Sequence, residues 1–470
     1  MRILLAKPYL SPPTLTGGNY VELEPLELEY LAAGLYNHDV ELIDMRYEKD
    51  LESRIVTFQP HVVASTAYSI HVYNTRRIME IAKRISEDIF TVVGGHHATL
   101  MPHDFQRKEI DAIVLGEGVY SFRDLVETLE RGLPIESVSG LCFRKDSDFV
   151  FTEPRSDIEN IDLFPLPNRN ITRKYRKEYF YLWWRPAALL RASVGCAYRC
   201  SFCPIWKAAG GKWKYRSPQL VADELATISE NFIYFCDDNA FFDSERMATL
   251  CQLIKERNIK KEYFFFSRPE ALVKCPDLVE NWAEIGLRIV FLGIEAVDTE
   301  KLRPLNKRMD SRTNKKAVEI LRRNGIDPLA AFIVFPEFSK KDFDQIYDYM
   351  EELGIYYSEF SVLTPLPGSN LYWERKEDLI TENYELFDNV HPVLPTRLTQ
   401  REFCKNLARL WIKAYSPLRV IRLKPTIRPP LSLGRITKTL RTALKNYYSI
   451  KNGYKAIRTR HDPLKTRFLS

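Results

Sequence analysis

Two successive arrays of short apolar runs, alternating with amphipathic stretches, constrain the fold of this chain more than any other feature. The first array holds five runs with the length of buried strands, and helical periodicity fills the gaps between them. Such alternation is typical of an open parallel sheet with helices on both faces. We therefore predict a doubly wound, Rossmann-like α/β domain over residues 1–135. Its expected strands are 2–7, 40–44, 62–66, 91–95 and 112–116.

Three of these expected strands end in polar or glycine-rich residues. Ligands of doubly wound sheets bind beyond the carboxyl ends of the strands, where glycine lets the backbone approach a ligand closely. The alternative is that these stretches are only tight turns between strand and helix. We interpret them together as one binding edge, formed by Ser65, Thr66, Gly94, Gly95, His96, Gly116, Glu117 and Gly118.

The second array spans 186–395 and follows a Pro- and charge-rich segment, 136–185, which we expect to be a linker or small appendage. Six strand–helix units predict a partial (β/α)6 barrel of the TIM type, whose chemistry sits at the carboxyl ends of the strands. The expected strands are 188–194, 232–238, 263–269, 289–295, 329–335 and 359–365. Charged residues at these ends could be catalytic or could form structural ion pairs across the mouth; they are Asp237, Asp238, Arg268 and Glu295.

The stretch VGCAYRCSFC places Cys196, Cys200 and Cys203 directly after the first expected barrel strand. A structural zinc site needs a fourth ligand, usually Cys or His, and Cys236 could supply it only in space. A four-iron cluster held by three thiolates instead leaves one iron open to a substrate or cofactor. We favour the cluster, because its missing fourth ligand need not be a side chain.

The motif formed by Cys196, Cys200, Phe202 and Cys203 resembles the signature of the radical S-adenosylmethionine (SAM) superfamily. ASTAYS, VVGGHHAT and IDAIVLGEG in the first array resemble the cobalamin-binding domain of one subfamily, and FIYFCDDNAFFD, FLGIEAVD and LTPLPGS resemble its barrel. The resemblance implies a [4Fe-4S] cluster that binds SAM and cleaves it reductively to methionine and a 5′-deoxyadenosyl radical. It also implies cobalamin as a cofactor and an external one-electron donor of the flavodoxin or ferredoxin type.

On the cobalamin side, the resemblance implies that Ser65 and Thr66 face the nucleotide tail and that Gly94 and Gly95 line its channel. It places Gly116, Glu117 and Gly118 near the corrin ring, with His96 as a further cofactor-binding candidate. The loop after the first expected strand, KPYLSPPTLTGGNY, departs from the common pattern because it contains no histidine. We therefore expect that no histidine ligates the lower face of cobalt.

On the SAM side, the resemblance implies that Glu295 holds the ribose and that Arg268 contacts the carboxylate. Asp237 and Asp238 would lie near the nucleoside or the substrate, and Phe202 would border the cofactor. The fifth barrel strand, FIVFPEFS, lacks the glycine-rich turn that is frequent in the subfamily, which leaves the local nucleoside contacts open.

From residue 418 onwards the chain carries fourteen Lys and Arg but one acid, Asp462, whereas the rest is mildly acidic. We predict a basic helical region over 396–470, including an amphipathic helix whose apolar stripe contains Leu444. This tail and the aromatic run YFYLWW (179–184) suggest peripheral contact with an anionic membrane. The alternative is that the helix packs on the protein itself. Without a spanning apolar run or a signal peptide, we expect a cytoplasmic location.

The resemblance implies methylation of an unreactive carbon through methylcobalamin. VVGGHHATLMPHDF is similar to the hopanoid methylase branch, so we expect a polycyclic or isoprenoid lipid as substrate. A radical cyclase or carbon–carbon coupling enzyme would share every motif and remains an alternative. A tRNA-modifying enzyme of the methylthio type is disfavoured because no cysteine precedes Cys142, and we expect no nucleic acid partner. A non-enzymatic iron–sulfur or zinc protein would not need the glycine-rich sheet edge.

Overall fold

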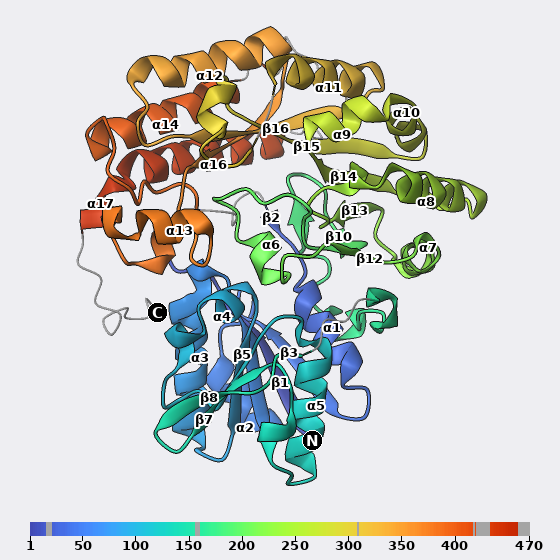
Figure 1. The fold of residues 1–470 in the computed structure, drawn as a ribbon, viewed down its shortest axis with the longest axis vertical. Helices are drawn as coiled ribbons and strands as arrows, with labels where there is room; N and C mark the ends of the chain where they lie inside the picture. The colour runs from blue at the N-terminus through green and yellow to red at the C-terminus, as the bar shows by residue number, and fades with distance from the viewer. Residues whose placement is uncertain (16–20, 156–159, 308–309, 417–418, 420–432, 459–470) are drawn as a thin grey trace.

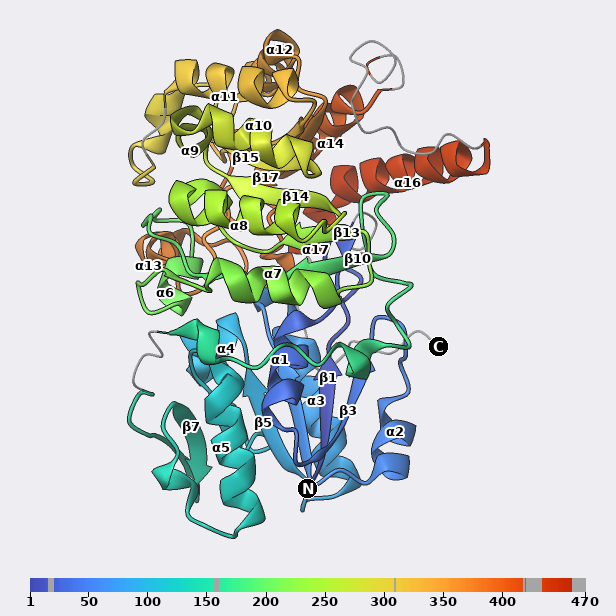
Figure 2. The same cartoon turned by 90° about the vertical axis from the view of Figure 1, so that its right-hand side faces the viewer.

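The computed structural model describes residues 1–470 except 16–20, 156–159, 308–309, 417–418, 420–432 and 459–470. Two α/β units are stacked along the long axis of the molecule, with the N-terminal sheet at one end and the second sheet at the other (Figure 1). A view turned by 90° shows the same stacking (Figure 2). The predicted order of a doubly wound unit followed by a barrel-like unit is confirmed.

The N-terminal sheet has the strand order β3-β1-β4-β5-β6-β7-β8, and its first five strands are parallel. In β1, Ile3 and Leu5 pack with α1 and α5, whereas Leu4 and Ala6 pack with α2 and α3. Because helices cover both faces, the strands are apolar on both sides. The elements are β1 (Arg2–Lys7), β3 (Asp39–Asp44), β4 (Val62–Thr66), β5 (Phe90–Gly94), β6 (Ala112–Val114), α1 (Leu26–Gly34), α2 (Leu51–Phe58), α3 (Val72–Ile85), α4 (His96–Leu100) and α5 (Gly118–Glu130).

The expected linker contributes to this sheet, which differs from the irregular structure that we predicted there. β7 (Leu141–Lys145) and β8 (Asp148–Phe151) form a hairpin that extends the sheet antiparallel to β6. The buried side chains of Leu141, Cys142 and Phe143 hold β7 in the core, while β8 is mostly exposed. β7 has only three successive apolar residues and β8 is the exposed edge strand, so the sequence pattern did not reveal the hairpin.

The second sheet has six parallel strands in chain order, β10-β13-β14-β15-β16-β17, with helices on its outer face. Within the described residues β10 and β17 are not paired, so the barrel is partial, as predicted. Its strands are β10 (Ala187–Leu190), β13 (Phe232–Phe235), β14 (Glu262–Ser267), β15 (Leu287–Glu295), β16 (Asp327–Val334) and β17 (Tyr357–Val362). The covering helices are α7 (Pro218–Thr227), α8 (Ser244–Glu256), α9 (Pro269–Lys274), α10 (Pro276–Glu284), α11 (Ser311–Arg323) and α12 (Lys340–Leu353).

The aromatic run YFYLWW closes the amino end of the partial barrel. Within it, β9 (Phe180–Tyr181) pairs with β2 (Val21–Glu22). The Tyr181 ring lies 4.6 Å from that of Phe264, and Trp184 is almost fully buried. The expectation that this run serves a membrane surface is therefore wrong: its large rings fill the space at the strand starts.

The C-terminal region is helical, and α16 (Leu433–Asn452) packs along α14 (Gln400–Ala414) (Figure 1). On the side toward the body, Tyr447 packs against the core and Ile450 is buried. Leu444, in the predicted apolar stripe, is 51% exposed, so the stripe is only partly packed on the body. Much of the basic tail, 420–432 and 459–470, lies outside the described residues. Of the helices described, none combines the length and the apolar character needed to cross a bilayer.

A buried ion network joins the N-terminal unit, the linker and the barrel. Arg169 of the linker lies 2.5 Å from Glu24, which precedes α1, and 2.8 Å from Glu224 of α7. Arg176, also in the linker, pairs with Glu24 and with Glu230. Because these carboxylates are almost fully buried, the network fixes the position of one unit relative to the other.

Candidate functional site

A cavity of about 1400 Å³ lies between the carboxyl edges of the two sheets. Sites for a single small molecule occupy about 300–1,000 Å³, so this cavity is large enough for more than one ligand. Both edges that we predicted from the sequence face it. Its lining includes Ser65, Thr66, Gly94, Gly95, His96, Gly116, Glu117 and Gly118 from the first unit, and Phe202, Cys203, Asp238 and Glu295 from the second.

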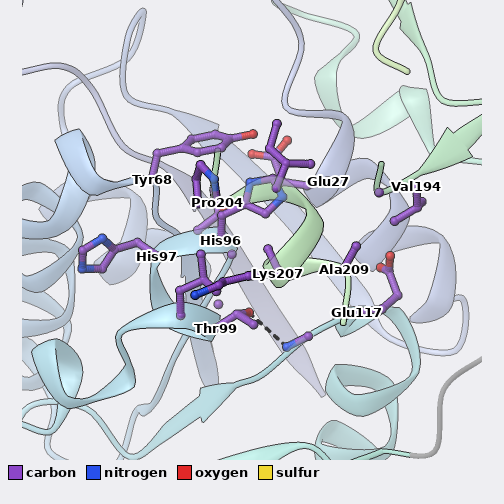
Figure 3. A pocket seen from close by; sticks show the side chains of 18 of the residues that line it. Glu27, Tyr68, His96, His97, Thr99, Glu117, Val194, Pro204, Lys207 and Ala209 are labelled. Carbon is purple, nitrogen blue, oxygen red and sulfur yellow. Dashed lines mark hydrogen bonds between the residues drawn. The ribbon is translucent and has the colours of Figure 1, made fainter. Parts of the chain in front are cut away.

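The binding edge of the first unit is formed by the ends of β4, β5 and β6. Gly95 has φ +97°, and a Cβ atom there would lie only 2.6 Å from Thr66 Oγ1, so no larger residue fits. The Gly116 N–H donates a hydrogen bond of 3.0 Å to Thr99 Oγ1 (Figure 3). The Ser65 hydroxyl donates to the carbonyl of Ala6, and this bond fixes the end of β4 against β1.

The two histidines of VVGGHHAT point in different directions (Figure 3). His96 lines the cavity, with its ring 5.2 Å from that of Tyr68, and burial lowers the pKa of its imidazole. His97 turns toward Ser69 and Asp104, with a ring nitrogen 3.0 Å from each side chain. Both histidines border the cavity, but both ring nitrogens of His97 already have partners, so His96 is the one free to contact a ligand.

The cysteine loop runs from β11 (Ser193–Val194) to α6 (Ile205–Ala208). Cys200 is buried, Cys196 and Cys203 are half-buried, and burial raises the pKa of the Cys203 thiol to about 12. Within the described residues, no three His, Cys, Asp or Glu side chains converge as they would around a single metal ion. A cluster of several irons is wider than one ion, and a loop with three free thiols beside an open cavity fits it.

The cysteine loop also approaches the binding edge of the first unit. α6 lies against α4, which begins at His96. Pro204 and Lys207 of this loop lie near His96 and Thr99 at the cavity wall (Figure 3). A cluster on the loop and a ligand on the glycine edge would therefore be neighbours in one chamber.

The two adjacent aspartates at the end of β13 have different environments. Asp237 does not line the cavity and accepts hydrogen bonds from the Ala192 N–H and the Ser193 hydroxyl, which join β13 to the strand beside it. Asp238 faces the cavity, and burial together with the neighbouring Asp237 carboxylate raises its pKa to about 7. The structure thus brings only Asp238 of the pair into the site.

The other two charged candidates also differ in whether they line the cavity. Glu295 ends β15 at the cavity wall and forms a 2.5 Å ion pair with Lys307. Arg268 pairs with Glu270 and lies with its guanidinium 4.0 Å from the centroid of the Tyr198 ring, outside the cavity lining. One of its nitrogens is 3.9 Å from Cys200 Sγ, so Arg268 borders the cysteine loop.

Sequence reasoning missed Arg191, a cavity residue just after β10. Its guanidinium lies 4.2 Å from the centroid of the Tyr30 ring, and one nitrogen is 3.3 Å from Glu117 of the opposite unit. The sequence signal that could have identified Arg191 is its position as a charged residue within the otherwise apolar run ALLRASV. Arg191 adds a cationic group where the two units meet across the cavity.

The comparisons with known proteins agree with this geometry. The B12 binding domain family matches residues 16–126, and the Radical SAM superfamily matches 190–350. The chain is 31% identical over 398 residues to the hopanoid C-3 methylase of Methylococcus capsulatus, covering 83% of this chain and 76% of that protein. It is 28% identical over 411 residues to the anaerobic magnesium-protoporphyrin IX monomethyl ester cyclase of Rubrivivax gelatinosus, covering 84% and 73%.

A solved structure shares the fold. The cobalamin-dependent SAM radical enzyme OxsB, with aqua-cobalamin and SAM bound, aligns with a TM-score of 0.69 at 18% identity, covering 95% of this chain and 72% of that chain.

Fold and site therefore define a radical SAM enzyme with an N-terminal cobalamin-binding domain. The chain belongs to the cobalamin-dependent radical SAM methyltransferase family. Its cofactors are a [4Fe-4S] cluster, SAM and cobalamin. The roles of single residues toward these cofactors remain predictions.

Proposed function

We propose that this enzyme methylates an unactivated carbon of a lipid-like, polycyclic or isoprenoid substrate. The single cavity shared by the cysteine loop and the glycine edge carries the proposal, because it lets one substrate reach both. The 31% identical relative named for hopanoid C-3 methylation supports the substrate class. Apolar lining residues such as Leu189, Phe291 and Ile333 suit a hydrocarbon skeleton.

In this proposal the chain binds the cofactors and the substrate, orients them and encloses them. Cys196, Cys200 and Cys203 hold the cluster, Glu295 and Asp238 contact SAM or substrate, and the glycine edge admits the corrin. When bound, these cofactors supply a 5′-deoxyadenosyl radical for hydrogen abstraction and a methyl group for transfer. A substrate held between the two sheets would have less contact with bulk water, which would protect reactive species.

Cyclisation is the second candidate, because the relative from Rubrivivax gelatinosus is named as a cyclase. Turnover with SAM that carries a trideuterated methyl group separates the two reactions. Methylation predicts a product that is heavier than the substrate by one deuterated methyl group in place of hydrogen. A product that has lost hydrogen without gaining deuterium would identify a cyclase and overturn methylation.

The two aspartates provide a matched pair of variants. Asp237→Asn should lower the melting temperature of the cofactor-free protein, because it weakens the bonds to Ala192 and Ser193. Asp238→Asn should raise the free energy of unfolding at pH 8 but not at pH 3, below the ordinary pKa of an aspartate. The raised pKa means that the folded protein binds an extra proton between about pH 4 and 7 and loses stability as pH rises through this range.

We expect the Asp238→Asn gain at pH 8 to be on the order of 4 kcal/mol in denaturant unfolding. Turnover of the reconstituted enzyme should fall in Asp238→Asn. Equal pH profiles of stability for Asp238→Asn and wild type would contradict this placement of Asp238.

The exposed face of α16 is our candidate for membrane contact. Arg441, Leu444, Lys445 and Tyr448 are all exposed and share one side of the helix, since they are three or four residues apart. A cationic face with two exposed apolar side chains suits the surface of an anionic bilayer.

The double variant Arg441→Glu/Lys445→Glu should reduce co-sedimentation with vesicles of anionic lipid at least tenfold, since each cation contributes about 1 kcal/mol near such a surface. Lys108→Glu/Arg131→Glu makes the same change in charge at exposed positions of the N-terminal unit and serves as the control. Equal losses in both double variants would show only a net-charge effect.

A further inference from the structure

The inner face of the partial barrel carries a carboxyl group that the functions described so far do not use. In β17, Phe360 points outward, with its ring 5.2 Å from that of Trp411 on α14. Because side chains alternate along a strand, Tyr357, Glu359 and Ser361 all point inward. Tyr357 packs against Trp183, and Ser361 lines the cavity. Glu359 lies between them on the same face.

The strand register places Glu359 at the floor of the cavity. Its neighbour across the sheet is Ala331 of β16, which lines the cavity. Below this level, the rings of Tyr181, Tyr234 and Phe264 close the barrel, with centroids 4.5–5.0 Å apart. Glu359 is itself accessible. Glu359 is not itself among the lining residues, but it lies beside Ala331 and one step below Ser361, both of which line the cavity, and above the aromatic floor.

The surroundings disfavour the charged form of this carboxyl group. Burial within the barrel, and then the Glu295 carboxylate, raise the pKa of Glu359, while a hydrogen bond with the Ser361 side chain opposes this shift more weakly. A neutral carboxyl group can both donate and accept a hydrogen bond. The aromatic and apolar surroundings penalise an isolated charge but accept a hydrogen-bonded neutral pair.

We propose that Glu359 forms a hydrogen-bonding subsite on the cavity floor that takes a hydroxyl group of an otherwise apolar substrate. This inference rests on the proposed function, since it names a chemical feature of the same substrate. The apolar walls hold the hydrocarbon skeleton, and the hydroxyl group becomes the partner of Glu359. A substrate without a polar group would displace water from this carboxyl group without replacing its hydrogen bonds, and would therefore bind more weakly. The subsite therefore selects for a hydroxylated end and fixes how far the skeleton enters the barrel.

Binding of small rigid probes tests the subsite without turnover. The probes are 1-adamantanol, adamantane and 1-adamantylammonium, titrated calorimetrically into the anaerobic, reconstituted enzyme without reductant. We expect wild type to bind the alcohol about tenfold more tightly than the hydrocarbon, and also more tightly than the ammonium ion. Glu359→Gln should keep the preference for the alcohol, because its amide still forms hydrogen bonds. Glu359→Leu should bind the alcohol and the hydrocarbon equally.

The control is Glu280→Leu, at an exposed position of α10, which should behave as wild type. Unchanged iron and cobalt contents would show that the Glu359 variants are folded. The subsite is overturned by an alcohol preference that survives in Glu359→Leu, by tighter binding of the ammonium ion, or by no binding of any probe. Because no methyl transfer is measured, these outcomes are independent of whether the enzyme methylates its substrate.

Discussion

The triple variant Cys196→Ala/Cys200→Ala/Cys203→Ala will lose all its bound iron and its reductive cleavage of SAM. The three thiols lie on one loop, and in our proposal each supplies one of the three protein bonds to the cluster. A cluster with fewer thiolates is not retained, so we expect 5′-deoxyadenosine formation to fall below detection. Iron analysis and chromatography of the SAM products measure both effects.

The matched control is Cys275→Ala, which removes a half-buried free thiol outside the loop. It should keep its full iron content and SAM cleavage. The glycine edge does not depend on the cysteines, so cobalamin should still bind to the triple variant. Iron retained in the triple variant would show that other residues hold the metal.

Arg169→Ala will strongly destabilise the fold, by about 3–5 kcal/mol, because it leaves buried carboxylates without their partner. Its guanidinium contacts Glu24, Glu224 and the carbonyl oxygen of Leu189, and Glu29 lies 3.5 Å away. These groups come from the N-terminal segment, α1 and the barrel. Loss of Arg169 should therefore also loosen the two units relative to each other.

Denaturant unfolding of the cofactor-free protein measures this effect. Arg257→Ala is the control, because Arg257 forms a more exposed ion pair of 2.6 Å with Asp223. Exposed pairs contribute about 0–1 kcal/mol, so this variant should resemble wild type. An Arg169→Ala protein as stable as the control would show that the buried network does not join the units.

Most of the fold was predictable from apolar strand runs. Such runs arise because helices cover both faces of the first sheet and the outer face of the second. β1 is apolar at every position from Ile3 to Ala6, which identifies a buried parallel strand. The hairpin β7–β8 escaped prediction because an edge strand needs few apolar residues. We predicted that the aromatic run YFYLWW contacts a membrane. Composition alone does not distinguish aromatic rings at a membrane surface from rings that fill the end of a barrel.

The site was predictable at the level of strand ends but not of single side chains. Parallel strands bring their carboxyl ends to one edge, so both the glycine edge and the cysteine loop could be placed in advance. Asp237 and Asp238 are neighbours, and only the three-dimensional structure shows which of them faces the cavity. The contact of Arg191 with Glu117 joins residues of two units and left no periodic signal.

The most direct test of the account is metal analysis of the anaerobically purified protein after reconstitution with iron, sulfide and hydroxocobalamin. We predict about four iron atoms per chain, as in a [4Fe-4S] cluster, together with one cobalt atom. Iron without cobalt would contradict a cobalamin site at the glycine edge and with it the proposed methyl transfer. Zinc without iron would contradict the cluster and the radical chemistry altogether.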